Sequence, residues 1–247
     1  MNKVALSLSH VNKVFKTDGQ KTVSVIHDVS LDILSGEIFV FVGPSGSGKS
    51  TLLRIMSGIE KSFTGEVKRS KDVSPHDMSF VFQQFAIMPW LTVFENVELA
   101  LIARGVKQGE RGHTVMRELK QLGLEKSKDS YPRDLSGGMR QRVGIARALV
   151  TNPKIIFMDE PFSELDSFTA ASLRKELLDI WQERRPTIVM VTHVVEEALE
   201  LADKIAVLTP RPARVEKVVV DNLPRPRDTR SKNFYQLEDE LYQLIKP

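Results

Sequence analysis

The stretch Gly43–Thr51, with the sequence GPSGSGKST, combines the residue types that bind phosphate. Its glycines let the backbone wrap closely around an anion, and its N–H groups and the following helix N-terminus point at that anion. Lys49 is expected to neutralise β- and γ-phosphate charge, and Ser50 to ligate Mg²⁺. An apolar strand pattern before the stretch and a helical pattern after it disfavour the alternative, an ordinary Gly/Ser-rich turn. The predicted nucleotide-binding residues here are Gly43, Pro44, Ser45, Gly46, Ser47, Gly48, Lys49, Ser50 and Thr51.

Two carboxylates, Asp159 and Glu160, follow the apolar run Ile155–Met158. Successive side chains along a strand point to opposite faces, so the two carboxylates are expected to point in different directions and to suit different roles. Asp159 is expected to hold Mg²⁺ through its water shell, and Glu160 to polarise an attacking water. A solvated strand end capped by acids is the alternative, and the phosphate loop upstream disfavours it.

Phosphoryl transfer needs in-line water, Mg²⁺ and positive charge around the γ-phosphate, and the chain has a candidate for each. Adenylate and guanylate kinases share the loop but transfer phosphate to a second nucleotide. GTPases carry a downstream NKxD-type motif that reads the base. Asn12-Lys13 precedes the loop and lacks the aspartate, which disfavours a GTPase.

The elements that must position these residues form an alternating pattern. Short runs rich in Val, Ile and Phe are typical of buried strands, and amphipathic patterns are typical of helices. The predicted strands are Ile38–Val42, Phe80–Phe82, Ile155–Met158, Ile188–Val191 and Ile205–Leu208. The predicted helices are Ser50–Met56, Met139–Leu149, Ala170–Trp181 and Val195–Leu201. This alternation predicts an α/β fold with a mainly parallel sheet.

Three regions differ from that pattern. Half-polar strand candidates in the first part of the chain predict an antiparallel flank, at Val4–Val11, Val23–Val25 and Glu66–Lys68. Between about 83 and 131 no strong strand is present, and Val93–Ala103 and Thr114–Leu122 predict a helical insertion. From Pro210 onward, prolines are expected to break regular structure ahead of a final helix at Asn233–Ile245.

The octet Leu135–Arg142, LSGGMRQR, resembles the signature motif of ATP-binding cassette (ABC) ATPases. Phe82-Gln83, the run MDEPFSELD at Met158–Asp166, and Thr192-His193 match the same family in order and approximate spacing. The resemblance covers nearly the whole chain. It implies a single nucleotide-binding domain over 1–247, a P-loop NTPase of the ABC type. Its RecA-like core and β flank would be 1–82 and 151–247, and its α-helical subdomain 83–150.

The resemblance also implies individual roles. Gln83 resembles the Q-loop residue that contacts Mg²⁺ and the water, and His193 resembles the switch histidine that contacts the γ-phosphate. Ser163–Asp166 resembles the D-loop, with Asp166 in the nucleotide site. Phe15 lies where the family has an aromatic side chain that stacks on adenine; a core role is the alternative. The implied catalytic set is Glu160, His193, Gln83 and Lys49, and the implied metal ligands are Ser50, Gln83 and Asp159.

In this family the signature peptide of one subunit completes the ATP site of a partner, which implies a head-to-tail dimer, homomeric or heteromeric. Ser136, Gly137 and Gly138 would then bind nucleotide. Ser136 is a good N-cap for the helix Met139–Leu149, and the glycines expose backbone N–H groups. A helix cap with a flexible lead-in is the alternative. The chain departs from the family at Glu164, where a small residue is usual, and at Val194, where Asp is frequent.

The Met-Pro-Trp-Leu-Thr-Val run that begins at Met88 resembles ATPases of nitrate, sulfonate and taurine importers, as do Leu208–Arg214 and Leu223–Arg227. This implies an ATPase subunit with permease subunits and an extracytoplasmic solute-binding protein, at the cytoplasmic face of a bacterial inner membrane. The apolar segment Ile87–Leu91 would suit docking of a membrane-domain helix, with subdomain core as the alternative. Lipid-trafficking or efflux systems, and a non-transport nucleotide-gated regulator, are the alternative functions.

Composition is consistent with this picture. A net charge of +3 does not suggest a nucleic-acid binder, and the absence of cysteine excludes a disulfide scaffold. No apolar run approaches the ~20 residues that cross a bilayer, so transport would need separate membrane subunits. The basic tail is expected to be a solvated face, or to meet anionic lipid. Its members are Arg211, Arg214, Lys217, Arg225, Arg227, Arg230 and Lys232.

Overall fold

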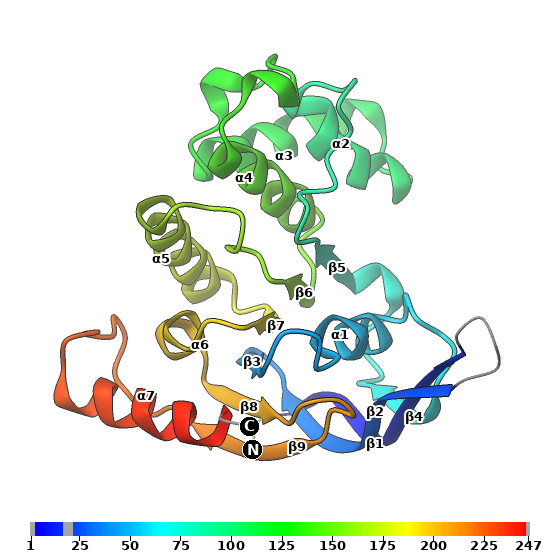
Figure 1. Ribbon diagram of the computed structural model, residues 1–247. Coiled ribbons are helices and arrows are strands. Elements are labelled where there is room, and N and C mark those ends of the chain that lie inside the picture. The colour runs from blue at the N-terminus through cyan, green and yellow to red at the C-terminus, as the bar shows by residue number, and fades with distance from the viewer. Residues whose placement is uncertain (1–2, 17–21, 246–247) are drawn as a thin grey trace. The chain divides into compact units, whose positions relative to one another are not determined.

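The computed structural model describes residues 3–16 and 22–245 (Figure 1). The chain divides into two compact units. The first consists of Met1–Ser74 and Arg185–Pro247, and the second of Pro75–Arg184. Within the described residues, no helix has the length and apolar character needed to span a membrane.

The first unit contains a small parallel sheet with an antiparallel edge. Its strands are β3 (Ile38–Val42), β7 (Thr187–Thr192), β8 (Lys204–Leu208) and β9 (Val215–Val220). β3 pairs in parallel with β7 and with β8, and β9 pairs antiparallel with β8. Every residue of β3 and β7 is buried, as expected for runs of Val, Ile and Phe that are covered on both faces.

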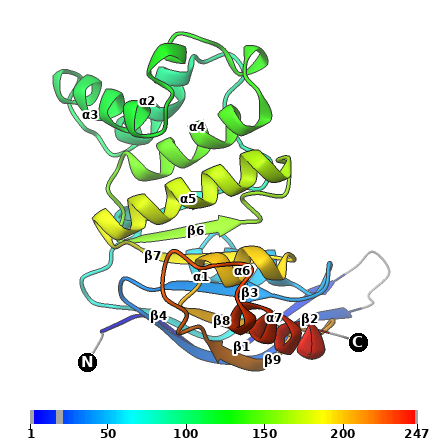
Figure 2. The same ribbon diagram turned by 90° about the vertical axis from the view of Figure 1, so that its left-hand side faces the viewer.

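Helices connect and cover these strands (Figure 2). They are α1 (Lys49–Ser57), α6 (Val195–Leu201) and α7 (Lys232–Ile245). α6 packs on β3 and β7, and α7 packs on α6 and β8. The amphipathic pattern of α7 explains this placement, because Phe234 and Leu241 are buried whereas Tyr235 and Tyr242 are about half exposed.

The predicted antiparallel flank is confirmed. Its strands are β1 (Val4–Lys16), β2 (Thr22–Leu34) and β4 (Thr64–Arg69), in the order β2-β1-β4. Both pairings are antiparallel. Leu6 and Leu8 are buried at alternate positions, which is the pattern of a strand with one face on a core.

The second unit contains a parallel strand pair and four α-helices among its described residues. The strands are β5 (Met78–Val81) and β6 (Ile155–Asp159). The helices are α2 (Val93–Ala103), α3 (Gln108–Gln121), α4 (Gly137–Leu149) and α5 (Ser167–Arg184). Short 3₁₀ turns are present at Pro75–Asp77, Glu125–Ser127 and Pro132–Asp134. This unit is wider than the helical section expected over 83–150, because β5, β6 and α5 belong to it; the domain assignment stays a prediction.

Two expectations for the C-terminal region are wrong. Prolines bracket a regular strand, β9, rather than excluding one, because the run between them pairs with β8 as the edge strand of the sheet, and an edge strand tolerates prolines at its limits. The basic tail is also not solvated throughout. Arg225 and Arg227 are largely buried and form ion pairs with Asp203 and Asp221.

Candidate functional site

The phosphate loop follows β3 and leads into α1, as predicted. Gly46 has φ 74° and Gly48 has φ 117°, the left-handed region that favours glycine. A Cβ at Gly48 would lie 2.9 Å from Val25 Cγ1, and one at Gly43 would lie 2.8 Å from the carbonyl oxygen of Leu208. The glycines are therefore required both for the turn and for its close packing on neighbouring strands.

Lys49 is directed back over its own loop. It is 4% exposed, and its Nζ donates to the carbonyl oxygens of Gly43 and Pro44, each at 2.9 Å. Ser47 Oγ is buried and has no hydrogen-bond partner within the described residues. A buried cation and an unsatisfied hydroxyl inside a glycine loop match the donor set that phosphate oxygens require. The loop therefore fits the phosphates of ATP.

His193 lies at the same edge of the sheet as the loop. In the parallel pairing of β3 with β7, Val42 is opposite Thr192. Gly43 and His193 follow these two residues, so both leave the ends of adjacent parallel strands, where ligands of open α/β sheets bind. The structure thus brings the predicted Lys49 loop and His193 together within the first unit, and His193 is exposed.

Phe15 is on β1 and is 40% exposed. The Nζ of Lys13 is 4.4 Å from the centroid of its ring, a cation–π contact. This exposure is inconsistent with the core alternative, and the stacking role stays a prediction.

The acidic pair and Gln83 form a similar arrangement in the second unit. Val81, two residues before Gln83, is opposite Met158 in the parallel pairing of β5 with β6. Asp159 ends β6 and is 2% exposed, and Glu160 has φ 44°. A positive φ at a non-glycine residue is uncommon and costs conformational energy, so the surrounding structure must hold this turn in place.

The turn after Glu160 is fixed by hydrogen bonds. The carbonyl oxygen of Glu160 accepts from the N–H of Ser163 at 3.3 Å and from its Oγ at 3.0 Å. The Nε2 of Gln83 donates to Ser163 Oγ at 3.4 Å. The second unit thus places Gln83 near the acidic pair, and Ser163, expected only as the first residue of the D-loop, bonds to both Gln83 and Glu160.

Ser136 has the predicted capping geometry. It is the N-cap of α4, and its Oγ accepts from the N–H of Met139 at 3.3 Å. Helix α4 begins at Gly137, so the backbone N–H groups of Gly137 and Gly138 belong to its first turn, which has no intrahelical acceptors for them. The capping prediction is confirmed, and the nucleotide-binding role of the three residues stays a prediction.

Asp166 caps a second helix, α5. Thr169 donates to it twice, from Oγ1 at 2.7 Å and from the backbone N–H at 3.0 Å, and these bonds lower the pKa of its carboxyl. Gly138 lies against the same threonine, because a Cβ at 138 would be 2.4 Å from Thr169 Cγ2. Thr169 therefore joins the signature peptide to the D-loop, a link that the motifs alone did not reveal.

The segment Ile87–Leu91 is held from two helices. Asn96 of α2, which is fully buried, accepts from the N–H of Met88 at 2.7 Å, and its Nδ2, which has two hydrogens, lies within 3.1 Å of three carbonyl oxygens, those of Met88, Leu91 and Thr92. Arg147 of α4 donates to the carbonyl oxygens of Phe85 and Ala86 just before the segment. Trp90 is 70% exposed, so the alternative that the whole segment is core is wrong for its largest side chain.

Comparison with known proteins gives a consistent result. The family described as ABC transporter matches residues 26–163. An uncharacterized ABC transporter ATP-binding protein of Methanocaldococcus jannaschii is 41% identical over 247 residues, covering 99% of this chain and 92% of that protein. A nitrate import ATP-binding protein of Synechocystis is 38% identical, covering 98% and 95%. An aliphatic sulfonates import ATP-binding protein of Bacillus subtilis is 36% identical, covering 96% and 93%.

A solved structure resembles the fold as well. It is a dimeric structure of a post-hydrolysis state of an ATP-binding cassette bound to ADP and Pi. It has a TM-score of 0.77 and 35% sequence identity, and the match covers 90% of this chain and 99% of that one.

Proposed function

The chain belongs to the ABC transporter family, and from that premise we propose that it is the ATP-hydrolysing subunit of an importer for a small anion such as nitrate or an organic sulfonate. ATP binding and ATP hydrolysis coupled to transport follow from family membership. The class of cargo is supported by relatives named for nitrate and sulfonate import that align over nearly the whole chain.

We assign the chemistry to residues that follow the carboxyl ends of the parallel strands and to Lys49 at the start of α1. Lys49 and His193 contact the γ-phosphate, and Glu160 is the general base that polarises the attacking water. Gln83 orients that water. The remaining nucleotide contacts are the loop Gly43–Thr51, Phe15 on adenine, and Ser136–Gly138 with Asp166 from a second subunit.

Mg²⁺ fits the oxygen donors that the proposal assigns to it. Ser50 supplies a hydroxyl, Gln83 an amide oxygen and Asp159 a carboxylate, which is the hard ligand type that this ion prefers alongside phosphate oxygens and water. When bound, the ion neutralises charge on the phosphates. Asp159 is 2% exposed, so a nearby cation would offset the cost of burying its charge.

The proposed assembly contains two ATPase subunits arranged head to tail, two permease subunits and an extracytoplasmic solute-binding protein. The subunit would lie at the cytoplasmic face of the membrane through its permease contacts. The dimeric cassette among the similar structures supports the first part of this proposal, and the import systems named for the relatives support the rest. Ile87–Leu91, with Trp90 exposed, is our candidate for the permease contact.

One observation carries the assignment. Each unit brings its predicted groups to the carboxyl ends of adjacent parallel strands, the loop with His193 in one and Gln83 with the acidic pair in the other. These residues are far apart in sequence and acquire common positions only through the fold, which is how an open α/β sheet builds a ligand site.

The Glu160→Gln variant tests the general base. It keeps the size of the side chain and one acceptor oxygen but removes its basicity, so we expect ATP-dependent dimerisation with hydrolysis reduced at least about a hundredfold. Light scattering and phosphate release measure the two effects. The exposed Glu125→Gln variant is the control and should match the wild type. Normal turnover by Glu160→Gln would sink the assignment.

The cargo is tested through the assembly. The permease and solute-binding protein encoded beside this chain would be reconstituted with it in vesicles, and ATP hydrolysis measured with nitrate, taurine or an alkanesulfonate. Stimulation by one of these anions is expected. Stimulation only by lipid, or none with any membrane partner, would contradict the importer proposal.

A further inference from the structure

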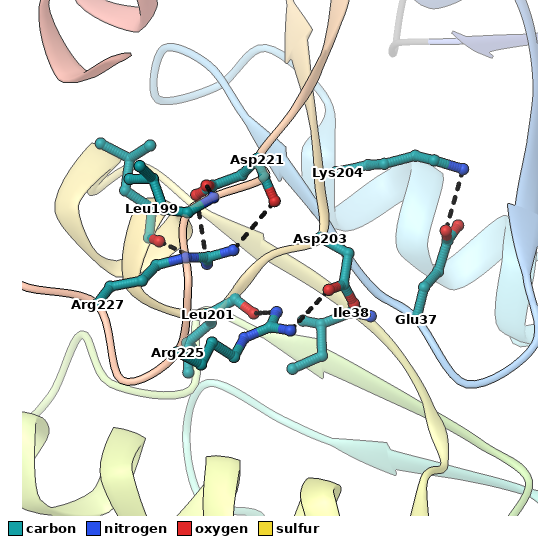
Figure 3. A network of polar contacts seen from close by, with 10 residues as sticks. Glu37, Ile38, Leu199, Leu201, Asp203, Lys204, Asp221, Arg225 and Arg227 are labelled. Carbon is teal, nitrogen blue, oxygen red and sulfur yellow. Dashed lines mark hydrogen bonds and ion pairs between the residues drawn. The ribbon is translucent and has the colours of Figure 1, made fainter. Parts of the chain in front are cut away.

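Arg225 ties the C-terminal segment to the sheet and to α6 (Figure 3). Its Nη1 is 2.7 Å from Oδ1 of Asp203, and its Nη2 donates to the carbonyl oxygen of Leu201, the last residue of α6. Oδ2 of Asp203 accepts from the N–H of Ile38 at 2.8 Å. One aspartate therefore connects the first residue of β3 with the arginine that caps α6.

Arg227 makes a second attachment to the same helix. Its Nη1 donates to the carbonyl oxygen of Leu199 at 2.6 Å and lies 3.3 Å from Oδ2 of Asp221. The Arg227 and Asp221 side chains are 2% and 0% exposed. Asp221 is itself fixed, because its N–H donates to the carbonyl oxygen of Asp203 at 2.9 Å.

Helix α6 is short and needs such attachments. It has 7 residues, and its N-cap, Val194, forms no side-chain cap hydrogen bond. Isolated helices of this length are unstable in water, and the carbonyl groups of the last turn have no intrahelical donors. The two guanidinium groups satisfy carbonyls of that turn and place positive charge at the negative end of the helix.

The other end of α6 is joined to His193. Thr192 Oγ1 donates to Oε2 of Glu197 in α6 at 2.6 Å, and it accepts from the N–H of Val194 at 3.1 Å. Thr192 and Glu197 are both buried. His193 therefore lies between Thr192, the last residue of β7, and Val194, the N-cap of α6. Because Thr192 Oγ1 is also hydrogen-bonded to Glu197, a displacement of the helix would strain the peptide that carries the histidine.

The network carries a desolvation cost. Burial raises the pKa of Asp221 and lowers that of Arg227 to about 10. Buried pairs of this kind often add little net stability compared with apolar residues of similar size. Stability alone is therefore a weak explanation for two arginines directed at the end of one short helix.

We propose that Arg225 and Arg227 are positioning residues for His193: they hold the C-terminal end of α6 and so fix the peptide Thr192–Val194 from which the histidine projects. The inference rests on the proposed role of His193 at the γ-phosphate. The tail beyond β9 then contributes to ATP hydrolysis without touching nucleotide.

The test uses variants that remove the donors to α6 and keep the fold. Arg225→Met leaves Asp203 with the N–H of Ile38. Arg227→Met is combined with Asp221→Asn, which removes the buried charge and retains an oxygen for the N–H of Leu223, 3.0 Å from Oδ1 in the native chain. Arg230→Met, an exposed arginine of the same tail, is the matched control.

The proposal predicts a separation of binding from turnover. Circular dichroism and ADP affinity should stay at wild-type values, while kcat falls about tenfold to a hundredfold, the scale of a small misplacement of a reacting group. Arg225→Lys should recover part of the loss. In a His193→Ala background the same changes should have no further effect on single-turnover hydrolysis, since residues that act through one group are not additive.

Other results would overturn the proposal. Folded Arg225→Met with wild-type kcat would do so, as would a further loss of single-turnover hydrolysis in the His193→Ala background. Normal turnover by His193→Ala itself would overturn the assigned role of His193 and this proposal with it. If His193→Ala is defective but Arg225→Met and Arg227→Met with Asp221→Asn turn over normally, the positioning role alone is overturned. If the double variant does not fold, Arg225→Met decides the question.

Discussion

Single residues of the candidate site are constrained by packing as well as by chemistry. Gly138 was predicted for its exposed backbone N–H, yet its contact with Thr169 is an independent reason for glycine at this position. Thr169 cannot turn its methyl away freely, because its Oγ1 donates to Asp166. The Gly138–Thr169 contact thus couples the signature peptide to the aspartate of the D-loop.

The Gly138→Ala variant should therefore destabilise the protein and impair hydrolysis together. The added Cβ would lie 2.4 Å from Thr169 Cγ2, and relief of this clash should cost about 1–3 kcal/mol of unfolding free energy. Urea unfolding and phosphate release measure the two effects. Thr169→Ser removes the methyl and keeps the hydroxyl, so Gly138→Ala with Thr169→Ser should regain stability. A stable Gly138→Ala single variant would contradict the close contact.

Site residues can be predicted from sequence where their chemistry requires particular residue types at a fixed spacing. Lys49 begins the helix after the phosphate loop, Ser136 caps a helix and Glu160 follows a strand end, as their motifs indicate. Ser163 and Thr169 were missed as partners because a hydroxyl has no distinctive pattern, and its partners are identified only when the turn is formed.

At the level of elements, apolar runs predicted the buried strands β3, β6, β7 and β8 to within a residue or so at their ends. β9 was missed because prolines on both sides suggested irregular structure, whereas an edge strand tolerates prolines at its limits. The burial of Arg225 and Arg227 was missed for another reason: their acceptors are carbonyl groups of α6, and backbone acceptors leave no trace in the sequence.

Asn96 anchors the segment of residues 88–92 that precedes α2. Asn96→Ala removes a buried amide whose oxygen and nitrogen make polar contacts with the backbone of residues 88–92, and we expect a loss of about 2 kcal/mol or more in unfolding free energy. Urea unfolding measures it. Hydrogen exchange should increase first in residues 85–92. Ile102→Ala, at a half-exposed position on the same helix, is the control and should change little. Unchanged exchange in the segment would contradict the anchoring role.

The whole molecule is organised so that each unit contributes a different part of the proposed chemistry. The first unit contains the phosphate loop and His193, and the second contains the acidic pair and the signature peptide. Sequence motifs predicted this inventory and its order along the chain. They did not identify the cargo, since no cargo-binding residue is expected in such a subunit and the resemblance to particular importers rests on Met88–Thr92, Leu208–Arg214 and Leu223–Arg227.

The Ser136→Arg variant tests whether the signature peptide acts within its own chain or on a partner. Ser136 is exposed at the start of α4, so a large cation there should leave nucleotide binding by the monomer intact and stop hydrolysis by the assembly. ADP affinity and phosphate release measure the two effects. Because the substitution also removes the N-cap, worth about 1 kcal/mol, Ser136→Ala is the matched control that loses the cap without adding bulk or charge. Weaker ADP binding by monomeric Ser136→Arg, but not by Ser136→Ala, would place the peptide in its own chain's pocket and contradict the head-to-tail assembly.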